Sequence, residues 1–167
     1  GTIYINATGG QTDDRVGFRY VWNYYNRVPR PMYIQDPANT WAYTTATVRQ
    51  ANANTANQLD FVIGVAEVEV YGEIIVAFAN TSVGVQGAVG IGEDTTTAIT
   101  AGGIIATGYT NVANQQVHSV ATLRRYPAAG RHFWSWNEYS GATGTMTWIG
   151  DNNGTFEQSG IHGTLMG

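Results

Sequence analysis

Two residue types, cysteine and lysine, are missing from this sequence altogether. Without cysteine the chain can form no disulfide framework and has no thiolate nucleophile. Charged residues are also scarce: they make up 12% of the 167 residues, and the formal net charge is −4 at pH 7. The eight basic residues are all arginines, with Arg124-Arg125 as the only adjacent pair. A nucleic-acid-binding surface needs far more positive charge to neutralise phosphates, so we set that class of protein aside.

Long apolar runs are missing too. No stretch approaches the roughly 18 apolar residues of a membrane-spanning helix, so no membrane partner is predicted. The first ten residues, GTIYINATGG, have neither the positive charge nor the apolar run of a signal peptide, and none is predicted. Because 43% of the residues are hydrophobic, we expect one folded domain with its own core.

The clearest periodic pattern lies between Leu59 and Asn80. From Ala66 onward the even positions are apolar apart from one glycine, and they read Ala66, Val68, Val70, Gly72, Ile74, Val76 and Phe78. The odd positions between them include Glu67, Glu69, Tyr71 and Glu73. This alternation predicts a β-strand with one face in a core and the other in water. Gly72 keeps the alternation in step, which favours one strand bent at the glycine over a hairpin.

Alternation of the same kind, separated by turn-forming residues, recurs along the chain. It marks Val16–Val28, Thr40–Gln50, Gln115–Arg125, Arg131–Tyr139 and Ile161–Met166. We expect Thr143–Ile149 to pair with Arg131–Tyr139 as a hairpin. Nine or ten short strands at this spacing, with no competing helical pattern, predict an all-β fold, an antiparallel jelly-roll β-sandwich.

Three closely spaced prolines, Pro29, Pro31 and Pro37, suggest a division of the chain. They restrict Met32–Gln35 to an edge strand or an extended linker. We therefore predict that residues 1–36 form an N-terminal arm with the first strands, used for attachment or for contacts between subunits. Residues 37–167 form the jelly-roll body.

Candidate catalytic and metal-binding groups are weakly supported. Glu67, Glu69 and Glu73 would share a strand face, where solvated charges or partners for arginines explain them better than an acid pair or a cation site. The three histidines, His118, His132 and His162, lack the spacing of a zinc motif. Serine-nucleophile and phosphate-binding motifs are absent. We expect no enzyme activity, no metal and no cofactor.

Aromatic residues gather near the C-terminus, where Trp134, Trp136, Tyr139 and Trp148 fall within fifteen residues. Aromatic faces stack on pyranose rings, so this group could line a sugar-binding groove. It could equally be the sandwich core together with a subunit interface, where Trp and Tyr concentrate binding energy. Since aromatics make up 12% of the chain and are spread along it, the core-and-interface interpretation is favoured.

Three stretches together resemble a known group of proteins. They are RHFWSWNEYSGATGTMTWIGDNNGTFEQSGIHGTLMG at the C-terminus, Arg19–Val28, and WAYTTATVRQANANTANQLDFVIG from Trp41. Most of residues 15–167 resembles the jelly-roll domains of tailed-bacteriophage virion structural proteins, which are similar in build to the trimeric globular heads of the complement and tumour-necrosis-factor superfamily. The chain departs from those heads at His162 and Met166 and shows no collagen-like stalk before the domain.

The resemblance implies a homotrimer in a virion, assembled in the cytoplasm of a bacterial host, with the major capsid protein or other virion proteins as partners. The first hypothesis is thus a non-enzymatic protein that decorates or cements the capsid. An alternative is the head of a tail or head fibre that binds a host surface glycan or receptor, and a less favoured one is a glycan depolymerase.

These hypotheses assign residues to two kinds of surface. The candidates for the trimer interface are Trp22, Tyr24, Ile161, His162 and Leu165. Those for binding a glycan or another surface partner are Trp134, Trp136 and Tyr139. If Trp22 lies between subunits, Trp22→Ala should weaken the trimer.

Overall fold

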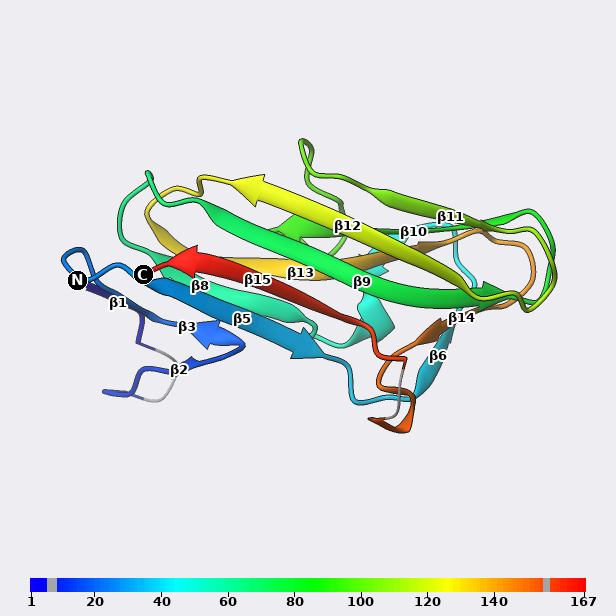
Figure 1. The fold of residues 1–167 in the computed structure, drawn as a ribbon, viewed down its shortest axis with the longest axis horizontal. Helices are drawn as coiled ribbons and strands as arrows, with labels where there is room; N and C mark the ends of the chain where they lie inside the picture. Colours follow the sequence, from blue (N-terminus) through cyan, green and yellow to red (C-terminus); the bar gives the residue numbers. More distant parts are fainter. Residues whose placement is uncertain (6–8, 155–156) are drawn as a thin grey trace.

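The computed structural model describes residues 1–5, 9–154 and 157–167, and they form a sandwich of two β-sheets (Figure 1). The front sheet of Figure 1 has the order β5 (Pro29–Gln35), β15 (Gly160–Met166), β9 (Val70–Asn80) and β12 (Val117–Arg125). Where β15 ends its pairing with β9, β14 (Met146–Ile149) takes the same side of β9, and β6 (Thr40–Tyr43) pairs with β14. The back sheet has the order β8 (Gln58–Ile63), β13 (Gly130–Ser140), β10 (Val85–Glu93) and β11 (Ala106–Thr110).

Shorter elements complete the back sheet and the N-terminal region. They are β1 (Thr2–Ile3) paired with β4 (Val21–Trp22), β2 (Asp14–Arg15), β3 (Phe18–Arg19) and β7 (Val48–Gln50). The only helical segments among the described residues are two 3₁₀ turns, η1 (Ala51–Ala53) and η2 (Asn152–Gly154).

The eight principal strands are connected in the order of a jelly roll. Counted along the chain from β5, the front sheet places the first, eighth, third and sixth strands side by side, and the back sheet places the second, seventh, fourth and fifth. All of these neighbours are antiparallel. Two packed sheets with this strand order are typical of that fold. The predicted fold class is therefore confirmed.

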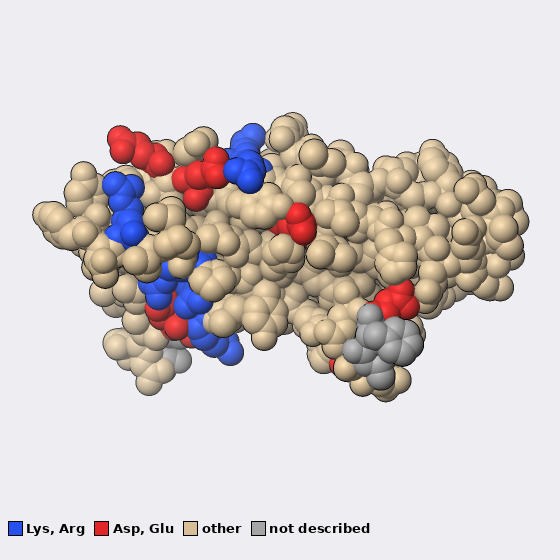
Figure 2. All heavy atoms as spheres, in the orientation of Figure 1, with Lys and Arg blue, Asp and Glu red and all other residues tan. Residues whose placement is uncertain are grey.

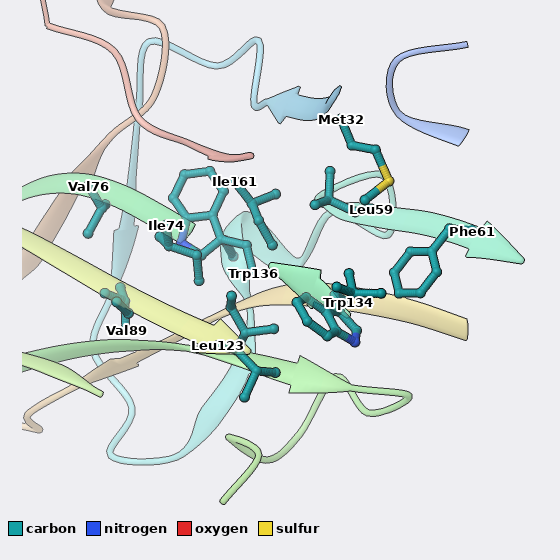
Figure 3. Packing of buried hydrophobic residues seen from close by; sticks show 14 of the residues in the cluster. Met32, Leu59, Phe61, Ile74, Val76, Val89, Leu123, Trp134, Trp136 and Ile161 are labelled. Atoms are coloured by element: carbon teal, nitrogen blue, oxygen red, sulfur yellow. The ribbon is translucent and has the colours of Figure 1, made fainter. Parts of the chain in front are cut away.

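The core fills the space between the sheets. Figure 3 shows Ile74, Leu123 and Ile161 from the front sheet packing with Trp134 and Trp136 from β13 of the back sheet. The largest fully buried side chains are Trp134, Trp136, Trp148, Phe61, Phe78, Met32, Leu59, Ile63, Ile74, Leu123, Met146 and Ile161. Each apolar side chain of this size contributes about 1.5–3 kcal/mol when it is fully buried. These contacts hold the two sheets at a fixed separation.

The glycine that interrupts the central alternation is explained by this core. A Cβ atom on Gly72 would lie 2.7 Å from the ring of Trp134, so the large indole of the back sheet requires a glycine opposite it. The predicted single strand through Gly72 is confirmed, because β9 runs unbroken from Val70 to Asn80. Its predicted start at Ala66 is wrong, since the chain turns at Ala66-Glu67 and enters the sheet only at Val70.

Two other strand predictions are wrong. Val16–Val28 is not one strand, because only the two-residue β3 and β4 form within it and each pairs with a different partner. Thr143–Ile149 does not pair with β13. The strand within it, β14, pairs with β6 and β9 in the front sheet, so the chain crosses between the sheets after Ser140. Alternation identifies a strand but not its partner.

The N-terminal residues are packed against the body. β5 is the edge strand of the front sheet and pairs along its whole length with the last strand, β15, which leaves its prolines at a permitted edge. The indole N–H of Trp22 donates to the backbone carbonyl of Met166 at 3.0 Å. Both termini lie at one end of the sandwich, which we call the terminal end; we call the opposite end the distal end (Figure 1).

Candidate assembly surface

The outer face of the front sheet presents three aligned rows of side chains. Residues directly opposite one another on neighbouring antiparallel strands point to the same side of a sheet. The rows that point outward from β5, β15, β9 and β12 are Gln35, Gly160, Ile75 and Val120; Tyr33, His162, Glu73 and Thr122; and Pro31, Thr164, Tyr71 and Arg124. We call these three rows the front face.

The front face leaves apolar side chains in solvent. Ile75 and Val120 face each other across β9 and β12 and are 41% and 49% exposed, and Tyr33 on β5 is 60% exposed. Scattered exposed apolar residues are normal, but Ile75 and Val120 are direct neighbours on one flat surface. This arrangement suits contact with another protein.

The back sheet differs because much of its outer side is covered. Residues 94–100 fold over it: Ile99 fills the space above Gly90, and the side-chain amide of Asn137 donates to the carbonyl oxygen of Ala98 at 2.6 Å. The neighbouring Ser135 hydroxyl donates to the carbonyl of Thr95 at 2.6 Å. On the front face no described segment covers Ile75 and Val120, which stay exposed. One sheet is therefore protected by its own chain and the other is not.

A shallow groove of about 240 Å³ opens in the front face where β15 begins. Gly160 leaves a gap in its row, and no side chain can replace it, because a Cβ atom there would lie 2.7 Å from the carbonyl oxygen of Ile34. The groove is lined by Tyr33, Ile34, Gln35, Ile75, Gln158, Ser159, Gly160, Ile161 and His162. Its mixture of aromatic, aliphatic and amide groups, with His162 at the edge, can accept an apolar side chain with a polar tip.

Charges on the front face are internally paired. Glu73 accepts a hydrogen bond from the Tyr71 hydroxyl, and its other oxygen lies 3.1 Å from Nε2 of His162. The hydrogen bond to Glu73 raises the pKa of Tyr71, with burial acting in the same direction. Arg124 lies over the ring of Tyr71 and contacts Glu69 at 3.1 Å. Figure 2 shows charged side chains concentrated toward the terminal end, with most of this side uncharged.

The predicted carboxylate cluster is thus divided between local partners. Glu69 pairs with Arg124, and Glu73 pairs with His162. The predicted pairing with an arginine of a neighbouring strand is therefore confirmed for Glu69. Glu67 and Glu69 lie before the start of β9 and so are not on the strand face where the alternation placed them. Among the described residues, no group of three or more His, Asp or Glu side chains is arranged to hold a metal ion.

Three of the five predicted interface residues lie inside the protomer. Trp22, Ile161 and Leu165 are at most 3% exposed and belong to the core cluster, so their assignment to a subunit contact is wrong. Alternation along β15 points Ile161 and Leu165 inward, and it points His162 outward onto the front face. Tyr24 is exposed near the terminal end, outside the three rows.

The predicted surface-binding tryptophans are also internal. Trp134 and Trp136 are fully buried between the sheets and cannot stack on a ligand, so this assignment is wrong. The sequence shows both on one side of a strand but does not say which side meets the other sheet. Tyr139 has the opposite parity and lies half-buried on the outer side of the back sheet.

Sequence reasoning missed a buried carboxyl group, Glu138, at the rim of the core. Trp41 donates its indole N–H to one carboxyl oxygen at 2.8 Å, and Arg49 contacts the other at 2.7 Å. Burial nevertheless raises the pKa of Glu138 to about 7, against the effect of these donors. No local sequence signal identifies it, because its burial depends on strands that are distant in sequence.

A second buried acid, Asp36, organises the polar loop that follows β7. Burial by itself would raise the pKa of this carboxyl group. Hydrogen bonds from the Ala38 backbone N–H and from the side-chain amides of Asn54, Asn57 and Asn52 outweigh burial and lower the pKa. This network explains the Asn-rich stretch ANANTANQ as a structural loop.

Comparison with known proteins adds no family to this geometry. No protein-family model matches the chain, and no curated protein matches it in sequence. Within the described part of the chain, no helix is long and apolar enough to cross a membrane.

Proposed function

We propose that this protein is a non-enzymatic structural component of a bacteriophage virion that assembles as a homotrimer and decorates or cements the capsid. The observation that carries the proposal is the contrast between the two sheets: part of the back sheet is covered by residues 94–100, and the front face exposes Ile75, Val120 and Tyr33. Burying such a surface against sister copies is favourable. The threefold state and the virion location rest on the resemblance of the sequence to phage jelly-roll domains.

The front face also explains how assembly could be specific. The groove beside Gly160 offers a concave feature next to the convex Tyr33, and the internally paired Glu73 and His162 need no charged partner. A neighbouring copy can therefore cover this face without leaving an unpaired charge buried, which would be costly. His162 is the one predicted interface residue that lies in the three rows.

The assembly is tested by size-exclusion chromatography with light scattering. We expect the wild-type protein to have three times the 18.0 kDa mass of one chain. Val120→Arg should give a monomer with unchanged circular dichroism, because the residue is exposed in the protomer and the charge would be buried in the trimer. Val83→Arg is the matched control, since Val83 is also exposed but lies in a turn outside the front face. A monomeric wild type, or a trimer unaffected by Val120→Arg, would contradict the proposal.

The virion location needs a separate test. Gold-labelled antibodies against the recombinant protein should bind purified phage particles of the source and should label the capsid shell. Label confined to host cells and absent from particles would refute this part of the proposal while leaving the assembly result intact.

A further inference from the structure

We infer that the distal part of the outer side of the back sheet is a binding surface for a neutral carbohydrate, with Tyr109 and Tyr139 as its aromatic contacts. The two tyrosines lie on β11 and β13, and β10 runs between them. This surface is on the opposite sheet from the front face, so both can be used at once. The inference goes beyond the proposed assembly and does not depend on it.

The strand register brings the two tyrosines to one side of the sheet. Tyr139 lies opposite Ala88, which lies opposite Thr107, and in the adjacent row Gln86 lies opposite Tyr109. Ala88 is small and buried, so the floor between the aromatic residues is closed. Tyr109 is 54% exposed and Tyr139 is half-buried, which leaves ring surface available to a ligand.

Three polar side chains at this surface, those of Tyr109, Tyr139 and Gln86, make no hydrogen bond to another described residue. Ile99, which covers the back sheet at Gly90, leaves Tyr109 more than half exposed. Flat aromatic rings beside free hydroxyl and amide groups match the alternating C–H and O–H surfaces of a sugar.

The surroundings select against a charged ligand. Residues 74–92, 95–117 and 139–150, which include β10, β11 and three turns at the distal end, contain no acidic, basic or histidine residue. On the side drawn in Figure 2, which is that of the front sheet, the distal end likewise has no coloured side chain. The nearest charged residues, Arg49 on β7 and Glu138 on β13, are paired with each other at 2.7 Å, so neither is free to pair with a charged ligand. A neutral sugar loses nothing by this absence.

The distal end is also preorganised. Asn80 joins three of its turns: its side-chain oxygen accepts the Ser82 N–H at 2.7 Å, its side-chain nitrogen donates to Thr143, and its backbone carbonyl accepts the Asn114 N–H at 2.7 Å. Both termini lie at the terminal end of the sandwich, so this surface is at the end farthest from them (Figure 1). A rigid surface loses little entropy when it binds.

The test uses an array of neutral hexose oligosaccharides with sialylated and sulfated counterparts on the same slide. Hits are then measured in solution by saturation-transfer NMR with the wild-type protein. We expect binding to neutral members only, with little dependence on salt. Tyr109→Ala should weaken that binding by about tenfold, since it removes an exposed stacking face. Tyr25→Ala is the matched control, because Tyr25 is 92% exposed and lies outside this surface.

A second substitution, Gln86→Ala, separates specific recognition from a loss of folding. It should weaken binding while circular dichroism and the melting temperature stay unchanged. Three results would overturn the inference: no neutral oligosaccharide bound at millimolar concentration, binding restricted to anionic glycans, or binding reduced equally by Tyr109→Ala and Tyr25→Ala. Each is distinguishable from a failure of trimer assembly, which is read from mass and not from ligand binding.

Discussion

Glu138 illustrates what one residue does when the fold removes it from water. It lies at the rim of the core with no exposed surface, in contact with Trp41 and Arg49. Desolvation disfavours the charged form, and here it exceeds the stabilisation that the two donors provide. The side chain therefore makes the stability of the domain depend on pH in a range where surface carboxyl groups have finished titrating.

We expect Glu138 to lower stability as the pH rises. Its pKa is about 7 in the folded protein and 4.5 as the ordinary value, so the folded state retains a proton that the unfolded state loses. The contribution is fully present below about pH 4.5 and is lost as the pH rises to about 7, with a magnitude on the order of 3 kcal/mol. Urea denaturation at several pH values should show this slope in the wild type and not in Glu138→Gln. Equal slopes in the two proteins would disprove it.

At the scale of elements, the N-terminal strands are attached by aromatic packing as well as by strand pairing. β4 is two residues long and pairs only with β1, too short a pairing to be stable by itself. Its Trp22 side chain belongs to the core cluster. Next to β4 in sequence, Tyr20 interacts with Asp60 and Arg131, and the Arg131 side chain donates a hydrogen bond to Asp60. The burial of Tyr20, together with the nearby charge of Asp60, raises the pKa of Tyr20 to about 12, so its hydroxyl stays neutral.

Trp22→Ala should therefore destabilise the protomer. Deleting a buried indole leaves a cavity, and the expected loss is about 3–5 kcal/mol in the free energy of unfolding. The measurement is denaturant unfolding at a protein concentration low enough for the protein to be monomeric. Tyr25→Ala serves as a nearby control, with a change within about 0.5 kcal/mol. A variant with normal protomer stability but weaker assembly would restore Trp22 to the subunit interface.

At the scale of the whole molecule, charge and exposed apolar surface are separated. On the side drawn in Figure 2 the charged residues gather toward the terminal end, and the charged groups of the front face are paired, Arg124 with Glu69 and Glu73 with His162. Association through the front face should accordingly be driven by apolar burial. Long-range electrostatic steering has little to act on there.

This predicts that assembly is insensitive to salt. Between 50 mM and 500 mM sodium chloride, the dissociation constant of the assembled protein should change by less than about threefold, because screening affects exposed charges more than apolar contacts. Analytical ultracentrifugation over a range of protein concentrations measures this. A trimer that dissociates at high salt would indicate that Arg124 and the carboxylates near it, and not Ile75 and Val120, hold the copies together.

The sequence by itself determined the all-β class, the closing strand and the continuity of β9 through Gly72. Those features depend on local alternation and turn residues, which are properties of neighbouring positions. It did not determine strand partners, which is why the hairpin expected across Ser140-Gly141 is absent. Pairing is decided by contacts between strands that are distant in sequence, and here β14 pairs with β9 instead of β13.

Which side of each strand faces the core was decided only by the tertiary structure. Alternation placed Trp134 and Trp136 on one side of β13 and Tyr139 on the other, with no means of telling inside from outside where both sides carry aromatic residues. The opposing sheet settles this, because the gap above Gly72 accepts the indole of Trp134. The difference between the two outer faces was also decided by the tertiary structure: residues 94–100 fold over the back sheet, while Ile75 and Val120 of the front face stay exposed.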